Sequence, residues 1–145
     1  MKHSTGPMNA EEARYVDACK WLDPHDGTFA PCTICELIDR RDEAPPHFEK
    51  LPAHHFHHFK SGNVRVGHLY GIGACIWHHE GDPVGQMSHR QMRDYYGVSL
   101  KGGSATFHDV YGTDAELLEL QDQLLRERGI EPPARPDSRR WSNSA

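Results

Sequence analysis

Two pairs of potential metal ligands share one spacing in this sequence. Cys32 and Cys35 are separated by two residues, and further along the chain Cys75 and His78 are separated by two residues as well. Two side chains at this spacing can lie on one side of a tight turn, and four thiolate or imidazole ligands suit tetrahedral Zn²⁺. The two pairs together therefore predict a Cys₃His zinc site.

Two other interpretations of these residues stay open. The cysteines could be buried free thiols accompanied by a surface histidine. Cys32 and Cys35 could instead form a redox pair, although no thioredoxin-like pattern of strand and helix surrounds them. Cys19 lies outside both pairs, in a helical pattern beside Trp21, where we expect it to be a small core residue.

Histidines are abundant beyond the predicted zinc site. The chain has 12 histidines, and one of them, His79, directly follows His78. Four more lie in one short extended segment: His54, His55, His57 and His58. Neighbouring histidines can serve one site if one binds a metal while the next reaches a substrate, but on a regular strand they point to opposite faces. Surface histidines without a role, or a second structural zinc, are the alternatives.

Composition and charge narrow the class of protein. With 145 residues, of which 37% are hydrophobic, the chain suffices for one modest domain with a thin core, which favours a stabilising cross-link. The net charge of −5 argues against a surface that binds phosphate over its whole extent, yet residues 54–101 carry +2 and the remainder −7. A site for an anionic ligand is therefore expected in residues 54–101. Without an apolar run of roughly 18 residues or a secretory signal, we expect a cytoplasmic protein with no membrane contact.

Helix and strand signals indicate the elements that position these residues. Helices are expected over residues 9–21, from 75 to about 79, over 88–96 and from a capping box at 113–116 to 129. Extended segments are expected over residues 53–59 and 68–74, with a turn at 61–63 between them. Residues 1–8 and 130–145, rich in Pro, Ser and charge, are expected to be disordered, which leaves one domain over residues 9–129.

The order of these motifs resembles that of zinc-stapled HNH nucleases, the ββα-metal fold. More closely, the stretches 57–68 (HHFKSGNVRVGH) and 71–79 (GIGACIWHH) resemble the RecA-dependent recombination-enhancement (Ref) nucleases of phages and prophages. The later stretch 97–112 also fits that group, and the resemblance covers roughly residues 31–125. It implies an α+β fold with a small zinc-stapled ββα-metal (HNH) core and flanking helices.

The resemblance also implies roles for individual residues. A structural zinc would be held by Cys32, Cys35, Cys75 and His78. His57 and His79 would bind a divalent catalytic metal, which could be Mg²⁺, Mn²⁺ or Zn²⁺. His58 would be the general base, and His68 would orient it or contact the scissile phosphate. The pair His54-His55 leaves a register shift of three residues open, although its spacing to the turn and to His68 is less favourable; His108 has no firm role.

The leading interpretation is a metal-dependent DNA endonuclease that hydrolyses phosphodiester bonds in a phage or prophage recombination module. The resemblance implies single-stranded or displaced DNA as substrate and a RecA-type filament as partner. The alternative is a non-catalytic zinc-stapled module that binds nucleic acid or a protein. Histidines outside the zinc site would be dispensable in such a module, and here they are all present.

Overall fold

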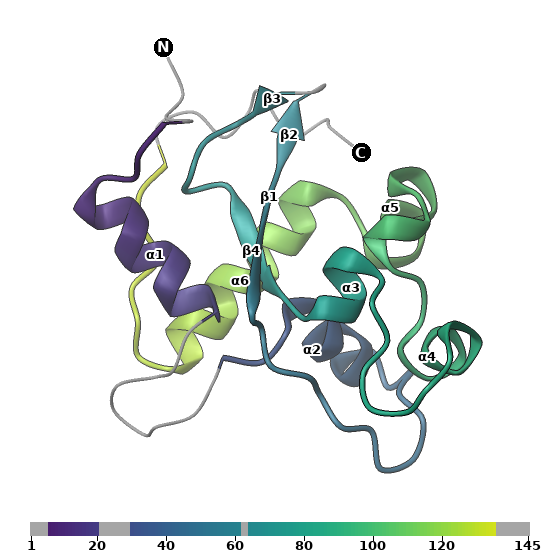
Figure 1. The fold of residues 1–145 in the computed structure, drawn as a ribbon. Coiled ribbons are helices and arrows are strands. Elements are labelled where there is room, and N and C mark those ends of the chain that lie inside the picture. The colour runs from purple at the N-terminus through teal and green to yellow at the C-terminus, as the bar shows by residue number, and fades with distance from the viewer. Residues whose placement is uncertain (1–5, 21–29, 62–63, 136–145) are drawn as a thin grey trace.

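The structure, a computed structural model, describes residues 6–20, 30–61 and 64–135. It is an α+β arrangement in which helices surround a small antiparallel sheet (Figure 1). The helices are α1 (Ala10–Lys20), α2 (Thr33–Arg40), α3 (Ile76–Glu80), α4 (His89–Tyr96), the 3₁₀ helix η1 (Leu100–Gly102), α5 (Ser104–Tyr111) and α6 (Asp114–Glu127). The strands are β1 (His55–His58), β2 (Lys60–Ser61), β3 (Val64–Arg65) and β4 (Gly71–Ala74).

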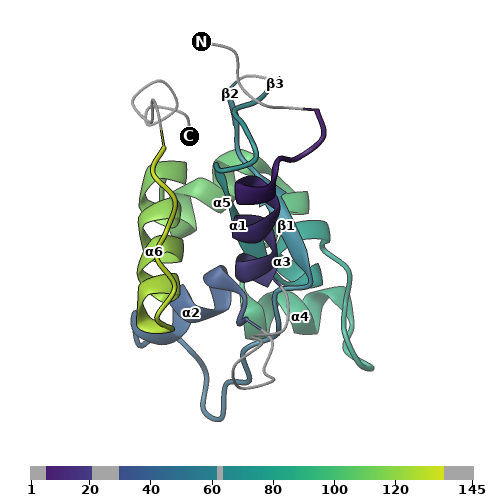
Figure 2. The ribbon, with the colours of Figure 1, turned by 90° about the vertical axis from the view of Figure 1, so that its left-hand side faces the viewer.

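The central feature is a long, interrupted β-hairpin. β1 pairs antiparallel with β4, so that His55 lies opposite Ala74 and His58 opposite Gly71. Beyond Phe59 the chain continues into β2, which pairs with β3. The Phe59 amide donates to the Tyr70 carbonyl (2.9 Å), which joins the inner and outer ladders. Figures 1 and 2 show the outer β2–β3 hairpin projecting beyond the helices.

The inner strand β4 is held tightly between helices. A Cβ atom on Gly73 would lie 2.0 Å from the carbonyl oxygen of Cys19, so only glycine allows α1 to lie this close to β4. On the other side, the buried Gln121 side chain of α6 accepts hydrogen bonds from the Gly73 amide and from the Thr33 hydroxyl of α2, each at 2.8 Å. Cys19 is buried in the core, as predicted.

Capping residues explain where several helices begin. Asn9 and Glu12 exchange hydrogen bonds at the start of α1, and Thr113 forms a capping box with Glu116 at the start of α6. Ser88 does the same for α4. These three helices match the predictions within one or two residues. Helices α2 and α5 had no sequence-based prediction.

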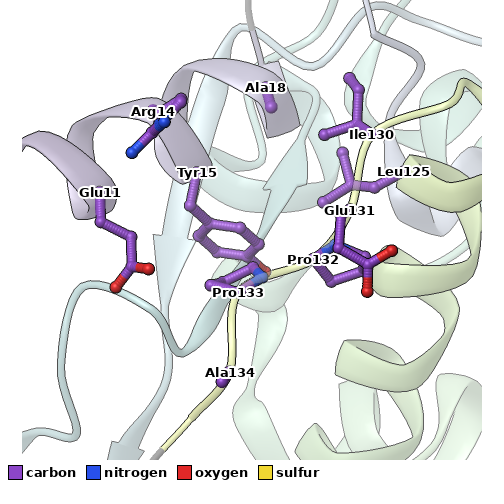
Figure 3. A pocket seen from close by; sticks show the side chains of 10 residues that line it. All are labelled: Glu11, Arg14, Tyr15, Ala18, Leu125, Ile130, Glu131, Pro132, Pro133 and Ala134. Carbon is purple, nitrogen blue, oxygen red and sulfur yellow. The ribbon is translucent and has the colours of Figure 1, made fainter.

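Part of the predicted disordered tail lies within the described residues. Residues 130–135 run back along α1 and α6 (Figure 2). Arg135 forms a two-pronged ion pair with Asp122 (2.7 and 3.1 Å), lies over the ring of Tyr15 and donates to the carbonyl of Leu69. With α1, this segment lines a pocket of about 310 Å³ (Figure 3).

The structure describes only some of the other residues that were predicted to be disordered. Residues 1–5 and 136–145 lie outside the described residues, whereas 6–8 lie within them. None of the helices in the described part of the chain is long and apolar enough to cross a membrane.

Candidate metal centre and histidine cluster

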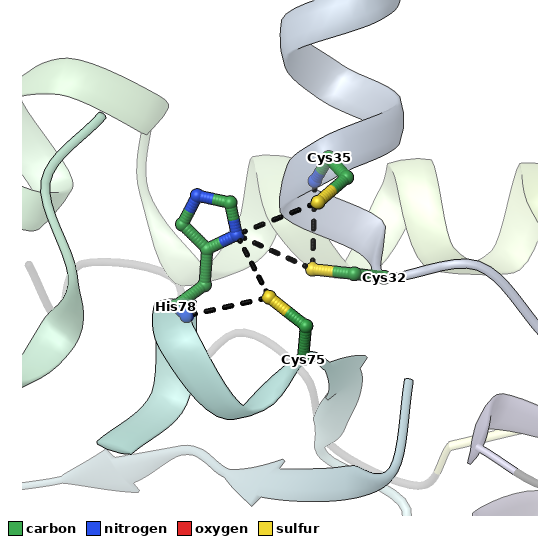
Figure 4. Close-up of side chains that lie close together, drawn as sticks. All are labelled: Cys32, Cys35, Cys75 and His78. Carbon is green, nitrogen blue, oxygen red and sulfur yellow. Dashed lines mark hydrogen bonds between the residues drawn. The ribbon is translucent and has the colours of Figure 1, made fainter. Parts of the chain in front are cut away.

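The structure brings the two ligand pairs together in the interior. Cys32, Cys35, Cys75 and His78 are all buried, and one potential ligand atom from each lies within 4.8 Å of the others. The Nδ1 atom of His78 is 3.2 Å from the sulfur of Cys75, 3.5 Å from that of Cys32 and 3.7 Å from that of Cys35 (Figure 4). Ligands of one tetrahedral zinc ion lie about 3.5 Å apart, given its usual bond lengths. The group can therefore hold a metal ion such as zinc.

Both pairs use the same local geometry. Cys32 caps α2 and Cys75 caps α3, and each sulfur accepts a hydrogen bond from the amide three residues later. These amides belong to Cys35 (3.5 Å) and His78 (3.4 Å). The cap turns the residue three positions later back toward the capping cysteine, which explains why two intervening residues suffice. The amide donors also stabilise the thiolate form that a metal requires.

A second contact fixes the orientation of the His78 ring. Its Nε2 atom is 2.8 Å from the carbonyl oxygen of Tyr96. Because a carbonyl can only accept, Nε2 carries the proton and Nδ1 presents its lone pair to the three sulfurs. A backbone partner of this kind is typical of histidines that bind metals.

The histidines of β1 divide between two faces of the strand. His55 and His57 face α3, where the Nδ1 atoms of His55 and His79 are 3.1 Å apart and the ring centres of His57 and His79 are 5.4 Å apart. Glu80 adds a carboxylate oxygen 3.3 Å from Nδ1 of His79. The structure thus groups His79 with His55 and Glu80 as potential metal ligands, whereas the predicted ligand His57 lies outside that group and only packs its ring against His79. Strict alternation along the strand was the sequence signal that could have identified His55.

His58 lies on the opposite face of β1, with His68. The Nε2 atom of His58 is 3.1 Å from Nδ1 of His68, whose own Nε2 atom contacts the carbonyl oxygen of Gly6 at 2.5 Å. Since that carbonyl can only accept, His68 carries its proton on Nε2 and accepts a hydrogen bond from His58 through Nδ1. In the neutral pair, the Nδ1 atom of His58 is therefore free of a proton.

Burial favours the neutral form of three of these imidazoles, those of His57, His58 and His79. It lowers the pKa of His57 to about 3, with further contributions from the nearby charges of His79 and His108. Burial also lowers the pKa of His58 to about 4, helped by Arg65 and His68. The pKa of His79 is lowered mainly by burial. A neutral imidazole is the form that binds a metal or accepts a proton.

Two further histidines considered in the sequence analysis, His108 and His54, lie outside both groups. His108 contacts Asp114 through Nε2 (2.7 Å) and the carbonyl of Ser104 through Nδ1 (2.8 Å), which joins α5 to the start of α6. Both of its nitrogen atoms are thus engaged in contacts within the fold. The exposed His54 lies just before β1.

The adjacent residues His78 and His79 point to different groups. His78 is 1% exposed and faces the cysteines, whereas His79 is partly exposed and faces β1. We call His55, His57 and His79 the histidine cluster. One short helix, α3, therefore carries one residue of the buried Cys₃His group and one of the histidine cluster.

A family model described as recombination enhancement, RecA-dependent nuclease matches residues 30–126. No curated protein and no solved structure gives a significant match to the chain. The matched span includes the whole Cys₃His group and the histidines on both faces of β1. Because the match extends over more than half of the chain, the protein belongs to the recombination enhancement, RecA-dependent nuclease family.

Proposed function

We propose that the protein is a metal-dependent DNA endonuclease of the HNH type, which hydrolyses phosphodiester bonds. The observation that carries this proposal is the convergence of His55, His57 and His79 beside α3, with His58 held by His68 on the other face of the same strand. One strand thereby supplies candidate metal ligands on one face and a candidate base on the other, so the scissile phosphate would have to lie at the edge of β1 that is not paired with β4 to reach both. The family name supports a nuclease that acts with RecA in recombination.

The order of elements supports an HNH core. Strand β1, its partner β4 and helix α3 come in that order in the chain, with β2 and β3 between the two strands, and α3 packs on β1. A structural zinc held by Cys32, Cys35, Cys75 and His78 would fasten the start of α3 to the start of α2. In this proposal it sets the position of His79 relative to β1 and takes no part in the chemistry.

His57 and His79 are the proposed ligands of the catalytic metal, and His55 is a candidate third ligand. The 3.1 Å separation of the His55 and His79 Nδ1 atoms fits two neighbouring ligands of one ion at usual bond lengths of about 2.1 Å. A set rich in imidazole suits Zn²⁺ or Mn²⁺ better than Mg²⁺. An ion held there would supply Lewis-acid stabilisation of the negative charge that develops in phosphodiester hydrolysis.

His58 is the proposed general base. Its Nδ1 atom accepts a proton from the water that attacks phosphorus, while the hydrogen bond from Nε2 to His68 fixes the ring. Burial and the nearby Arg65 lower the pKa of His58 to about 4, so its imidazole is neutral near pH 7 and can accept a proton.

We further propose a phage or prophage recombination module as the setting, and a single-stranded or displaced DNA strand bound by a RecA-type filament as the substrate. The RecA dependence in the family name supports the filament as partner. The position of positive charge supports an anionic substrate at the histidines, because the exposed Lys60 and Arg65 lie on the hairpin that follows β1 and Arg65 acts electrostatically on His58.

Incubation with circular single-stranded DNA tests the proposed function. We expect conversion to linear DNA with added Mn²⁺ or Mg²⁺, enhancement by a RecA filament, and no conversion in excess EDTA. A melting curve recorded in the same EDTA buffer checks that the protein remains folded. Circular DNA that is bound but stays intact with either metal and with RecA would contradict the proposal and favour the non-catalytic binding module.

A further inference from the structure

The outer β2–β3 hairpin supplies no proposed metal ligand or base to the site described above. It nevertheless carries an unusual charge arrangement. Lys60 and Arg65 occupy directly opposite positions in its ladder, and both are exposed. Like charges at such positions repel and destabilise the pairing. Among the described residues, neither side chain has an ion-pair or hydrogen-bond partner. Two unneutralised cations on so short a ladder point to an anionic ligand.

The position of the hairpin suggests which anion this is. β2 follows β1 after a single residue, Phe59, and the Val66 amide donates to the Phe59 carbonyl (3.1 Å), so the hairpin is a direct extension of the strand that carries the histidines. Figure 1 shows it projecting away from the helices, where a long polymer can reach it. A ligand on the hairpin therefore lies in line with β1.

The apolar residue Val64 adds a second feature. Its side chain is 65% exposed, more than any other large hydrophobic residue in the described part of the chain. It lies next to Arg65 in the same strand and opposite Ser61. Because neighbouring residues of a strand point to opposite faces, Val64 lies on the face of the ladder opposite to Lys60 and Arg65, so the contact with phosphates falls to the two cations alone.

We propose that the β2–β3 hairpin binds the backbone of a DNA strand through Lys60 and Arg65 and leads that strand to the histidines of β1. This inference rests on the proposed function, since it assigns the element that positions its substrate. It also accounts for DNA binding by an acidic protein, because the contact is local and needs no overall positive charge.

The variant K60A/R65A, compared with R90A/R93A, tests the proposal. Arg90 and Arg93 are exposed on α4, which Figure 1 places at the other end of the molecule, and their removal changes the net charge equally. Binding of a fluorescent single-stranded oligonucleotide is measured by anisotropy, without added catalytic metal and without a chelator, over a range of salt concentrations. We expect about ten-fold weaker binding for K60A/R65A, with a salt slope reduced by about 1.4, and less than about two-fold change for R90A/R93A.

Unchanged affinity and salt slope in K60A/R65A would overturn the hairpin proposal, as would equal losses in both variants. Cleavage of circular single-stranded DNA is followed in parallel so that the two proposals can fail separately. If the parent cleaves and K60A/R65A binds normally, the hairpin proposal fails and the proposed function stands. If K60A/R65A binds more weakly than the parent but the parent cleaves no DNA, the hairpin proposal stands and the proposed function fails.

Discussion

Cys75→Ser protein is expected to lose the structural zinc proposed for the Cys₃His group and to unfold. Cys75 is 1% exposed, and its sulfur belongs to the Cys₃His group and also accepts the capping hydrogen bond from the His78 amide at the start of α3. A structural zinc ion contributes roughly 10 kcal/mol or more to folding, comparable to the whole stability of a small domain of about 5–15 kcal/mol. Elemental analysis for zinc and far-ultraviolet circular dichroism measure the two losses.

Cys19→Ala provides the matched control, because Cys19 is an equally buried cysteine outside the metal group. We expect this variant to keep one equivalent of zinc and a cooperative melting transition. Parent protein that is well folded with less than half an equivalent of zinc would refute the structural role of the Cys₃His group. So would Cys75→Ser protein that melts like the parent.

His58→Ala is expected to reduce DNA cleavage by about 10²- to 10⁴-fold, the usual effect of removing one acid-base group. Zinc content, melting temperature and DNA affinity should remain close to those of the parent, because the base acts on the chemical step. The rate of linearisation of circular single-stranded DNA, at saturating metal and DNA, measures the effect. Added catalytic metal should not restore the rate.

His55→Ala distinguishes the two possible registers of the paired histidines. His55 lies beside His79, so we expect its removal to weaken binding of the catalytic metal, and excess metal should restore cleavage in part. An inactive His55→Ala that metal does not rescue, together with an active His58→Ala, would show that the base belongs to the other histidine pair.

Local patterns in the sequence were sufficient for the features that depend on neighbouring residues. Within each of the pairs Cys32/Cys35 and Cys75/His78, a helix cap brings the two side chains together, so the spacing alone predicts each half of the site. The helices with capping boxes were likewise predictable. Helix α5 was missed because the residue before it, Gly103, makes no side-chain cap.

Features that depend on distant residues could not be predicted. Arg135 gains its place from Asp122, Tyr15 and Leu69, which are far away in the sequence, so a polar tail gave no sign of these contacts. The proton positions on His58 and His68 likewise depend on the carbonyl of Gly6. The alternation of His55 and His57 was visible in the sequence, but only the structure brings His79 beside both.

Cleavage by His79→Ala protein tests most directly whether α3 carries a catalytic ligand beside a structural one. His79 faces β1, whereas its neighbour His78 faces the three cysteines. We therefore expect His79→Ala to purify as a folded, zinc-containing protein that fails to linearise circular single-stranded DNA at a metal concentration at which the parent completes the reaction. Cleavage by folded His79→Ala at the parental rate would contradict the assignment of the histidine cluster as the catalytic site.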